Sequence, residues 1–202
     1  MLDKDLRVLI HDLRNRIAPI RNATYLLKLK GGSDPHLQDT AAMIERQLQG
    51  MAELLDAASP AQNAQDAAPV AEPSKATEVS AEHRARRILI ADDSPAVCES
   101  LAAILRDLGH EVRTAHDGLE AIDVATTWTP DLVLLDVNMP KLNGYEAARR
   151  LRSQFPSSAM RLVMISGADI DSGVLAAARQ AGFDQCLDKL LDFGALRKLL
   201  QA

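Results

Sequence analysis

Acidic side chains follow apolar segments in the second half of this 202-residue chain, at positions where they could carry out metal or phosphoryl chemistry. Asp92 and Asp93 follow "RILIA", Asp136 ends "DLVLLD", and Asp188 and Lys189 end "QCLDK". Two like charges about 4 Å apart repel by about 4 kcal/mol at an effective dielectric of 20. Carboxylates brought together here would need a cation, and Mg²⁺, which prefers oxygen ligands, fits that need with Lys189 beside it.

The elements that must position these acids are short strands alternating with helices. The expected strands are "RILIA", "EVRTA", "DLVLLD", "MRLVMIS" and "QCLD", and the expected helices begin at Pro95, Gly118 and Gly144, near Asp169 and at Phe193. Strands that are apolar throughout indicate a parallel sheet covered on both faces, which predicts a doubly wound α/β domain. Functional sites of such sheets lie beyond the carboxyl ends of the strands, where the acids stand.

A structural explanation competes with this one for each residue. Asp92 and Asp93 could be turn and cap residues, with Ser94 as N-cap and Pro95 as first residue of the next helix. Asp136 could cap a loop, and Lys189 could be a surface charge. Because all of them fall at strand ends, we favour a common site.

Four segments, "ILIADDSP", "LVLLDVNMPKLNGYEAARRLR", "VMISGAD" and "LDK", resemble the receiver domain of two-component response regulators, over residues 87–202. The resemblance implies a five-stranded parallel sheet of order 2-1-3-4-5 and phosphorylation on Asp136. It implies that Ser166 is the switch hydroxyl and that Lys189 contacts the phosphoryl group. It also implies a Mg²⁺ site formed by Asp92, Asp93, Asp136 and the backbone carbonyl of Asn138.

Two positions depart from the pattern of that family. Leu190 follows Lys189 where the family usually has proline, and Cys186 stands where it commonly has an aromatic residue. These departures predict a muted or different conformational switch. Cys98 and Cys186, both in elements expected to be packed, are too few for a disulfide framework or a zinc site, so buried thiols are expected.

The first 58 residues predict a helical hairpin. Apolar residues recur at 4-3 spacing in two runs separated by Gly31 and Gly32: Leu6, Ile10, Leu13, Ile17, Ile20 and Leu27, then Leu37, Ala41, Ile44, Leu48, Met51 and Leu55. Two helices alone leave part of such a stripe in water, which favours a homodimer through residues 1–58 that forms a four-helix bundle. The alternative is a hairpin packed on the rest of its own chain.

Residues 59–86 are expected to be a linker, since they hold three prolines, many alanines and no aromatic residue. A flexible chain of this length has a root-mean-square reach of about 25 to 30 Å. The C-terminal domain could therefore reach the hairpin.

A histidine with polar neighbours lies on the first expected helix, in "LIHDLRNRIAPIRN". On this hairpin, "HDLRN" resembles the H-box of histidine-kinase dimerisation and phosphotransfer domains, over residues 5–58. The resemblance implies that His11 accepts a phosphoryl group, that Asp12 is its acid/base neighbour and that Asn15 positions hydrolytic water. Arg16 replaces the proline usual in the family, and Pro19 predicts a bend just beyond His11. The alternative is that His11 is a solvated surface residue.

Composition narrows the possible partners and location. With 28 acidic and 23 basic residues the net charge is −5, which argues against nucleic acid as a partner. The charged first ten residues and the lack of an apolar run of about 20 residues predict a cytoplasmic protein with no membrane segment. No Gly-rich nucleotide loop is present and no ATP-binding domain separates hairpin from receiver, so no autokinase activity is expected.

The favoured function is therefore that of a phosphorelay protein, exchanging phosphoryl groups between His11 and Asp136 or with a separate histidine kinase or response regulator. The sequence does not give the direction of transfer. One alternative is a receiver-controlled, dimeric docking module in which His11 is inert. Another is a phosphatase that acts on a partner receiver through Asn15.

Overall fold

The computed structural model describes residues 2–32, 34–58, 85–167, 170–190 and 193–201. The expected linker, 59–86, lies outside the described residues except for its last two. Two helices come first, α1 (Leu2–Lys30) and α2 (Pro35–Ala58). Strands and helices then alternate: β1 (Arg87–Ala91), α3 (Pro95–Asp107), β2 (Glu111–Ala115), α4 (Gly118–Trp128), β3 (Leu132–Asp136), α5 (Gly144–Gln154), β4 (Arg161–Ser166), α6 (Ser172–Ala181), β5 (Gln185–Asp188) and α7 (Phe193–Gln201).

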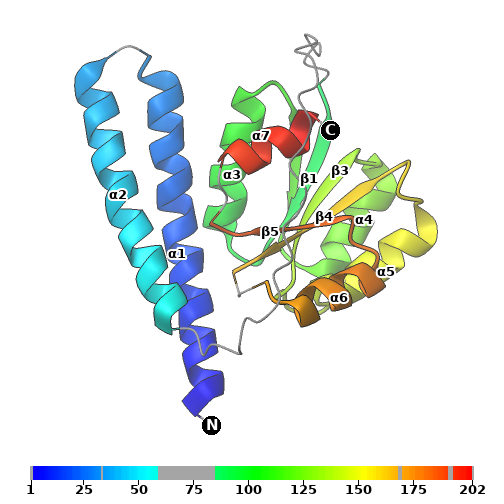
Figure 1. Cartoon of the computed structure of the whole chain (residues 1–202). Coiled ribbons are helices and arrows are strands. Elements are labelled where there is room, and N and C mark those ends of the chain that lie inside the picture. Colours follow the sequence, from blue (N-terminus) through cyan, green and yellow to red (C-terminus); the bar gives the residue numbers. More distant parts are fainter. Residues whose placement is uncertain (1, 33, 59–84, 168–169, 191–192, 202) are drawn as a thin grey trace, which may run out of the picture.

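The strands form one parallel five-stranded sheet in the order β2-β1-β3-β4-β5, which confirms the expected fold. Helices α3 and α7 cover one face of the sheet and α4, α5 and α6 cover the other (Figure 1). The expected strand and helix positions hold closely. The exception is α6, which begins at Ser172, where Asp171 accepts a hydrogen bond from the backbone N–H of Val174, rather than near Asp169.

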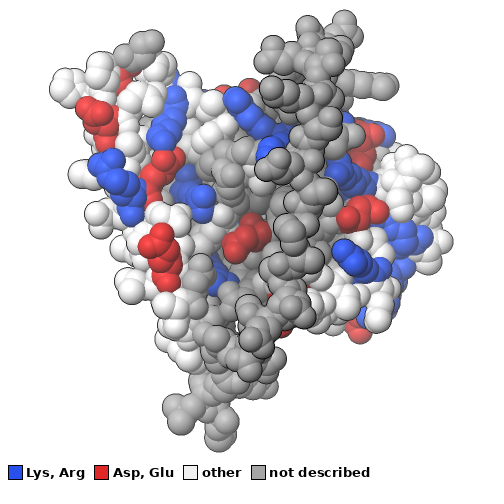
Figure 2. Space-filling view, in the orientation of Figure 1, with Lys and Arg blue, Asp and Glu red and all other residues white. Residues whose placement is uncertain are grey.

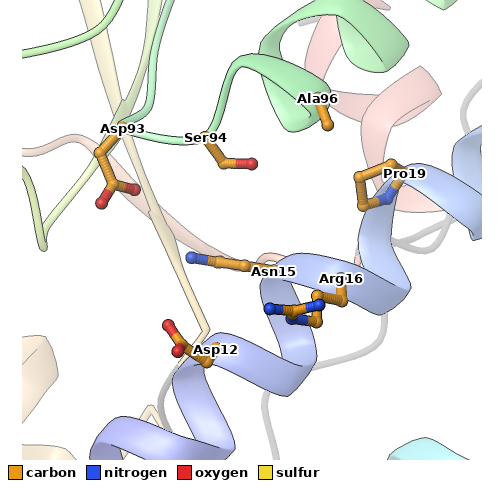
Figure 3. Close-up of a pocket in the computed structure, with 7 residues that line it drawn as sticks. All are labelled: Asp12, Asn15, Arg16, Pro19, Asp93, Ser94 and Ala96. Atoms are coloured by element: carbon orange, nitrogen blue, oxygen red, sulfur yellow. The ribbon is translucent and has the colours of Figure 1, made fainter.

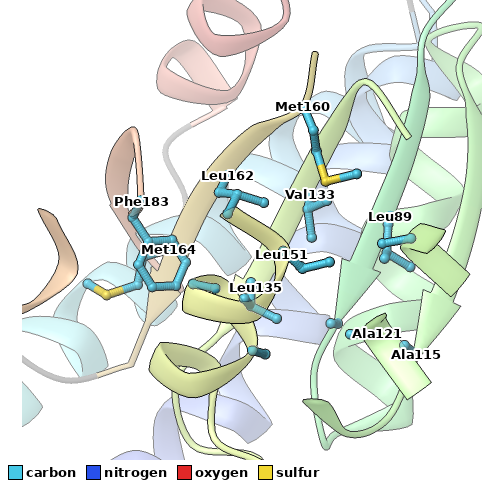
Figure 4. Packing of buried hydrophobic residues seen from close by; sticks show 14 of the residues in the cluster. Leu89, Ala115, Ala121, Val133, Leu135, Leu151, Met160, Leu162, Met164 and Phe183 are labelled. Carbon is cyan, nitrogen blue, oxygen red and sulfur yellow. The ribbon is translucent and has the colours of Figure 1, made fainter. Parts of the chain in front are cut away.

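Alternate side chains of the strands supply two separate cores, because neighbouring residues of a strand point to opposite faces. Leu89, Val133, Leu135, Leu162 and Met164 pack under α4, α5 and α6 (Figure 4). Their sequence neighbours pack under α3 and α7: Ile88, Ile90, Leu132, Leu134, Val163 and Ile165. Cys98 is buried in this second core as expected, whereas the expectation of a buried Cys186 is wrong, since that residue is only half-buried.

Two glycines let the backbone come close at the carboxyl edge of the sheet. A Cβ on Gly144 would lie 2.1 Å from the carbonyl oxygen of Asp136, and a Cβ on Gly118 would lie 2.2 Å from that of Leu142. Only glycine fits such contacts. The N-terminus of α5 is therefore held directly against the end of β3, which fixes the loop around Asp136.

The hairpin packs on the receiver part of its own chain, chiefly with α1 against α3 (Figure 1). Arg14 and Arg21 donate hydrogen bonds to the carbonyl oxygens of Gly167 and Leu190, the second at 2.7 Å, and Asn22 donates one to the hydroxyl of Ser100 at 2.9 Å. This packing is the alternative that sequence analysis set beside the homodimer. The homodimer itself stays a prediction.

Of the apolar stripe of α1, Ile17 packs with Val97 and Leu190 of the receiver, but much of the contact comes from another face of the helix. His11, Asn15, Ala18, Asn22 and Tyr25 follow one another at 4-3-4-3 spacing and so share one face. Ala18 on this face is 1% exposed and Asn22 is 6% exposed. The sequence does not mark this face as a contact surface, because its residues are mostly polar or small.

The apolar stripe of the hairpin is only partly covered. Ile10 and Ile17 are buried, while Leu13 and Ile20 are exposed by 37% and 50%. Helix α1 continues through Pro19, so the bend expected there does not end it. Neither α1 nor any other described helix is long and apolar enough to cross a membrane. Basic and acidic side chains intermingle on the face shown in Figure 2, with no continuous basic patch among the described residues there.

An arginine at position 18 should release the hairpin from the receiver. Ala18→Arg places a long charged side chain at a position that is 1% exposed. Overpacking of this kind destabilises the contact by about 1 to 3 kcal/mol or more. Small-angle X-ray scattering should show a larger radius of gyration than for the wild-type protein. The matched control is Ala23→Arg, on the exposed side of the same helix; equal scattering from both variants would contradict the packing.

Candidate functional site

The ends of β1, β3 and β5 bring two carboxylates and an ammonium group together. Lys189 Nζ lies 2.7 Å from Asp92 Oδ2 and 3.3 Å from Asp136 Oδ1. The three residues are only 2%, 1% and 3% exposed, for Asp92, Asp136 and Lys189 respectively. Lys189 is therefore not a surface charge, and the acids converge at the carboxyl edge of the sheet as the strand pattern predicts.

Backbone N–H groups hold both carboxylates in position. Asp136 Oδ2 accepts a hydrogen bond from the N–H of Asn138 at 3.0 Å, and Asp92 Oδ1 accepts one from the N–H of Ser94 at 2.9 Å. Ser94 is the N-cap of α3, although its side chain makes no capping bond. Asp92 is thus a turn residue as well as part of the acidic cluster, so the two explanations of this residue are compatible.

The remaining residues expected at the site surround this pair. The backbone N–H of Lys189 donates to the carbonyl of Ser166 at 2.7 Å, which joins the ends of β4 and β5. Ser166 is buried, while Asp93 and Asn138 are exposed at the rim. The structure therefore gathers the expected acids, hydroxyl and lysine around one pocket.

Burial sets the electrostatics of the pocket. Burial raises the pKa of Asp92 to about 6 and also raises that of Asp136, in both cases against the opposing effect of the Lys189 ammonium. Burial lowers the pKa of Lys189, but the carboxylates of Asp136 and Asp92 outweigh it, and the net pKa is raised. The ammonium is thus firmly charged, and the carboxylates carry an excess of negative charge that a cation would relieve.

The hairpin brings His11 to this pocket. A ring nitrogen of His11 and carboxylate oxygens of Asp93 and Asp136 all lie within 4.8 Å of one another. Close approach is possible because residue 167 is glycine: a Cβ there would lie 3.2 Å from His11 Nδ1. Burial, and next the charge of Lys189, lower the pKa of His11. The imidazole is therefore neutral near pH 7, with a lone pair available.

The other two residues of the H-box pattern lie beside His11. The amide nitrogen of Asn15 is 3.2 Å from His11 Nε2, one helical turn away. Asp12 is exposed. Both line a cavity of about 460 Å³ between α1 and the start of α3, bounded by Asp12, Asn15, Arg16, Pro19, Asp93, Ser94 and Ala96 (Figure 3). This cavity connects the rim of the acidic pocket with solvent.

Three contacts between α1 and the receiver were not predicted from the sequence. Arg14, with 1% of its surface exposed, and Arg21 bind backbone carbonyls of the two loops that flank the pocket, after β4 and β5. Leu190 is buried in a cluster with Ile17 and Val97. One sequence feature could have indicated these contacts. The seven-residue spacing of Arg14 and Arg21 places two basic residues on one face of α1, and the receiver carries an acidic cluster.

The two departures from the receiver pattern have different surroundings. Leu190 packs against the hairpin, and no cis peptide bond occurs among the described residues. Cys186 packs at the edge of the core beside Tyr145 and Phe183, whose rings meet edge to face. A muted or different switch stays a prediction.

The acidic pocket fits a hard divalent cation. Three carboxylates, those of Asp92, Asp93 and Asp136, face a single ammonium group, and Asp136 Oδ1 is buried with no hydrogen-bond partner among the described residues. Asp93 at the rim and the backbone of Asn138 complete an oxygen-rich set. Mg²⁺ held there would supply positive charge to a phosphoryl group that arrives at the pocket.

A doubly wound sheet of this strand order, with carboxylates, a serine and a lysine at its carboxyl edge, defines the receiver domain of two-component signalling. Residues 88–201 match the response regulator receiver domain family, and the chain belongs to that family. The match begins at residue 88, so α1 and α2 stand outside it.

Relatives and solved structures agree with this assignment. The chain is 36% identical over 116 residues to Protein PilH of Pseudomonas aeruginosa, which covers 57% of this chain and 95% of PilH. It is 51% identical over 67 residues to Response regulator MprA of Mycobacterium avium, and it spans only 29% of that protein. Chemotaxis protein CheY4 of Vibrio cholerae superimposes with a TM-score of 0.54 at 29% identity, over 58% of this chain and 98% of CheY4.

Magnesium should stabilise the protein, and this effect should weaken in acid. At 100 times its Kd, a ligand bound only by the folded state adds about 2.7 kcal/mol to the free energy of unfolding. Below about pH 6 protons compete for Asp92, whose pKa is raised to about 6, so the Mg²⁺-dependent rise in Tm should shrink between pH 7.5 and pH 5.

Thermal unfolding with and without Mg²⁺ measures this shift. Asp92→Asn should reduce it, and Asp123→Asn, an exposed acid on α4, should leave it unchanged. An equal Mg²⁺ shift in wild type and Asp92→Asn would show that the ion binds elsewhere.

Proposed function

We propose that this protein is a phosphorelay protein in which a phosphoryl group passes between His11 and Asp136 of the same chain. One observation carries the proposal: the packed hairpin holds a ring nitrogen of His11 within 4.8 Å of an Asp136 carboxylate oxygen. That separation leaves room for one phosphorus atom between nitrogen and oxygen. Holding the two groups so close replaces a bimolecular encounter with an intramolecular step.

The transfer is balanced without a further reactant. A carboxylate oxygen of Asp136 attacks the phosphorus of phosphorylated His11, the P–O bond forms, and the P–N bond breaks. The bonding electron pair returns to the imidazole, which is neutral near pH 7 because burial lowers its pKa. The reverse step uses the same lone pair as nucleophile.

The surrounding residues have distinct parts in this proposal. Lys189, which already contacts both Asp92 and Asp136, and Ser166 hold oxygens of the phosphoryl group on Asp136. Mg²⁺ bound by Asp92, Asp93, Asp136 and the Asn138 carbonyl would neutralise the phosphoryl charge. Asp12 is the acid/base neighbour of His11.

Partners supply and remove the phosphoryl group. We assign the ATP-dependent step to a separate histidine kinase and expect exchange with that kinase or with another response regulator. We also propose that this exchange takes place in the cytoplasm. No nucleic acid is part of the proposal.

The chemical stability of the adduct tests the transfer. When the receiver of the full chain is loaded with a labelled acyl phosphate, wild-type protein should acquire base-stable, acid-labile phosphohistidine besides the base-labile acyl phosphate on Asp136. His11→Ala should lose only the base-stable label, and Asp136→Asn should lose both. His36→Ala, on α2, is the control and should resemble wild type. If wild type never acquires base-stable label, the relay fails and a docking module with inert His11 is the better explanation.

A phosphatase function is favoured by a specific observation. The amide of Asn15 lies beside His11 and lines the cavity that reaches Asp93, so water there can approach the acidic pocket. Asn15→Ala should slow the loss of acyl phosphate from Asp136, or from a partner receiver, by about tenfold if the amide positions that water. The hydrolysis rate is measured from the release of labelled phosphate. An unchanged rate in Asn15→Ala would contradict this function.

We further propose that a second copy of the chain covers the exposed stripe of the hairpin. Leu6, Leu13, Ile20 and Leu27 recur every seven residues on α1 and are 37–50% exposed, and Leu37, Met51 and Leu54 extend the apolar surface on α2. Seven-residue spacing is typical of helices that pair in bundles. Ile20 lies two residues from Ala18, about 200° around the helix, so dimerisation and receiver docking use opposite sides.

Sedimentation velocity tests this dimer. Ile20→Asp should shift the protein to monomer, because it places a charge in the centre of the apolar contact. Ala176→Asp, which changes an exposed small residue on α6 away from the hairpin, is the control. A variant Ile20→Asp that sediments as wild type would contradict the bundle.

A further inference from the structure

One nitrogen and two carboxylates from three separate segments meet at the boundary between hairpin and receiver. His11 comes from α1, Asp93 from the loop after β1, and Asp136 from the end of β3. Their ligand atoms all lie within 4.8 Å of one another. This set differs from the all-oxygen set expected for Mg²⁺, because it includes an imidazole and exists only while the hairpin is docked.

Two of the three residues each have a buried side-chain atom that lacks a hydrogen bond. His11 Nδ1 and Asp136 Oδ1 have no hydrogen-bond partner within the part of the chain that the structure describes. Asp136 Oδ1 has only the ion pair with Lys189, at 3.3 Å. A buried polar atom is less stable without a full set of partners. A metal ion bound by His11 and Asp136 would provide both atoms with one.

The local charge favours a divalent ion. Asp92, Asp93 and Asp136 contribute three negative charges when ionised, and Lys189 contributes one positive charge. The excess of two negative charges equals the charge of one divalent cation. The cavity of about 460 Å³ reaches the exposed Asp93, which gives a hydrated ion a route to the site.

The ligand types decide which metal fits. Imidazole together with carboxylates suits Mn²⁺, Fe²⁺, Ni²⁺ and Zn²⁺, whereas Mg²⁺ is bound by oxygen ligands and water. We propose that docked His11, with Asp93 and Asp136, forms a site for a transition-metal ion that bridges α1 to the receiver. The proposal goes beyond the phosphorelay, since it requires the docked position of His11 and no transfer reaction.

Asn15 supplies the outer contact that such a histidine needs. Metal-bound histidines generally donate their second ring N–H to a neighbouring acceptor. The Asn15 side chain lies 3.2 Å from His11 Nε2, and its Oδ1 is buried with no hydrogen-bond partner among the described residues. Rotation of the amide places Oδ1 opposite Nε2–H and satisfies both atoms when the metal takes Nδ1.

The site has a regulatory consequence. It shares Asp93 and Asp136 with the Mg²⁺ set, so the two ions exclude each other. A bridging metal occupies both His11 and Asp136 and fastens the hairpin to the receiver. It therefore closes the phosphoryl-transfer pocket while it is bound.

Mn²⁺ is the probe, used with the full chain and no phosphodonor. Pulsed electron paramagnetic resonance of bound Mn²⁺ should show hyperfine coupling to a nitrogen nucleus, and His11→Ala should abolish it. Calorimetric titration should show a Kd for Mn²⁺ at least about tenfold higher in His11→Ala, with the Kd for Mg²⁺ changed less than twofold. His116→Ala is the control, because His116 Nδ1 lies 3.4 Å from the carbonyl oxygen of Asp92 but outside the ligand set.

Ala18→Arg provides a second variant that keeps all three ligands. By undocking α1 it should also abolish the nitrogen coupling, whereas Ala23→Arg should keep it. Nitrogen coupling that survives in His11→Ala, or a Kd for Mn²⁺ that changes no more than that for Mg²⁺, would overturn the proposal. Because no phosphoryl donor is present, failure of the metal site leaves the phosphorelay untouched, and the reverse also holds.

Discussion

Charge repulsion among buried carboxylates is the constraint on which the rest of this structure depends. Asp92 and Asp136 are both nearly inaccessible to solvent, and the Lys189 ammonium contacts both. One ammonium cannot balance them together with Asp93, so the pocket is stable only with protons, a cation, or both. Burial raises the pKa values of Asp92 and Asp136, and the neighbouring acids add to the effect. A pocket with this deficit of positive charge fits a divalent cation with oxygen ligands.

The hairpin places basic and neutral side chains beside that pocket. Arg14 and Arg21 bind the carbonyls after β4 and β5, and neutral His11 lies close to Asp93 and Asp136. Gly167 leaves space for the ring, and Leu190 adds an apolar contact on the receiver side. The loops after β4 and β5 therefore both border the acidic pocket and hold α1.

Different faces of the hairpin helices are buried to different extents. Ile10 and Ile17 are buried, whereas Leu13 and Ile20, from the same apolar stripe, stay exposed. A third face, centred on Ala18, meets the receiver. Packing on the receiver leaves Leu13 and Ile20 exposed, because a helix with 3.6 residues per turn presents these faces at separate angles.

The sequence by itself determined the local structure and the identity of the acidic site. Apolar runs of four to six residues, the Pro95 and Gly144 helix starts and the acids at strand ends each depend on neighbouring residues, so they predict the sheet and the convergence of Asp92, Asp136 and Lys189. Tertiary structure alone decided that His11 faces Asp136. The face of α1 that carries His11 is polar, and polar residues at helical spacing look the same in sequence whether water or an acidic pocket lies opposite. Only the shape and charge of the folded receiver distinguish a polar face that meets water from one that meets an acidic pocket. Neither the hairpin pattern nor the linker encodes that shape and charge.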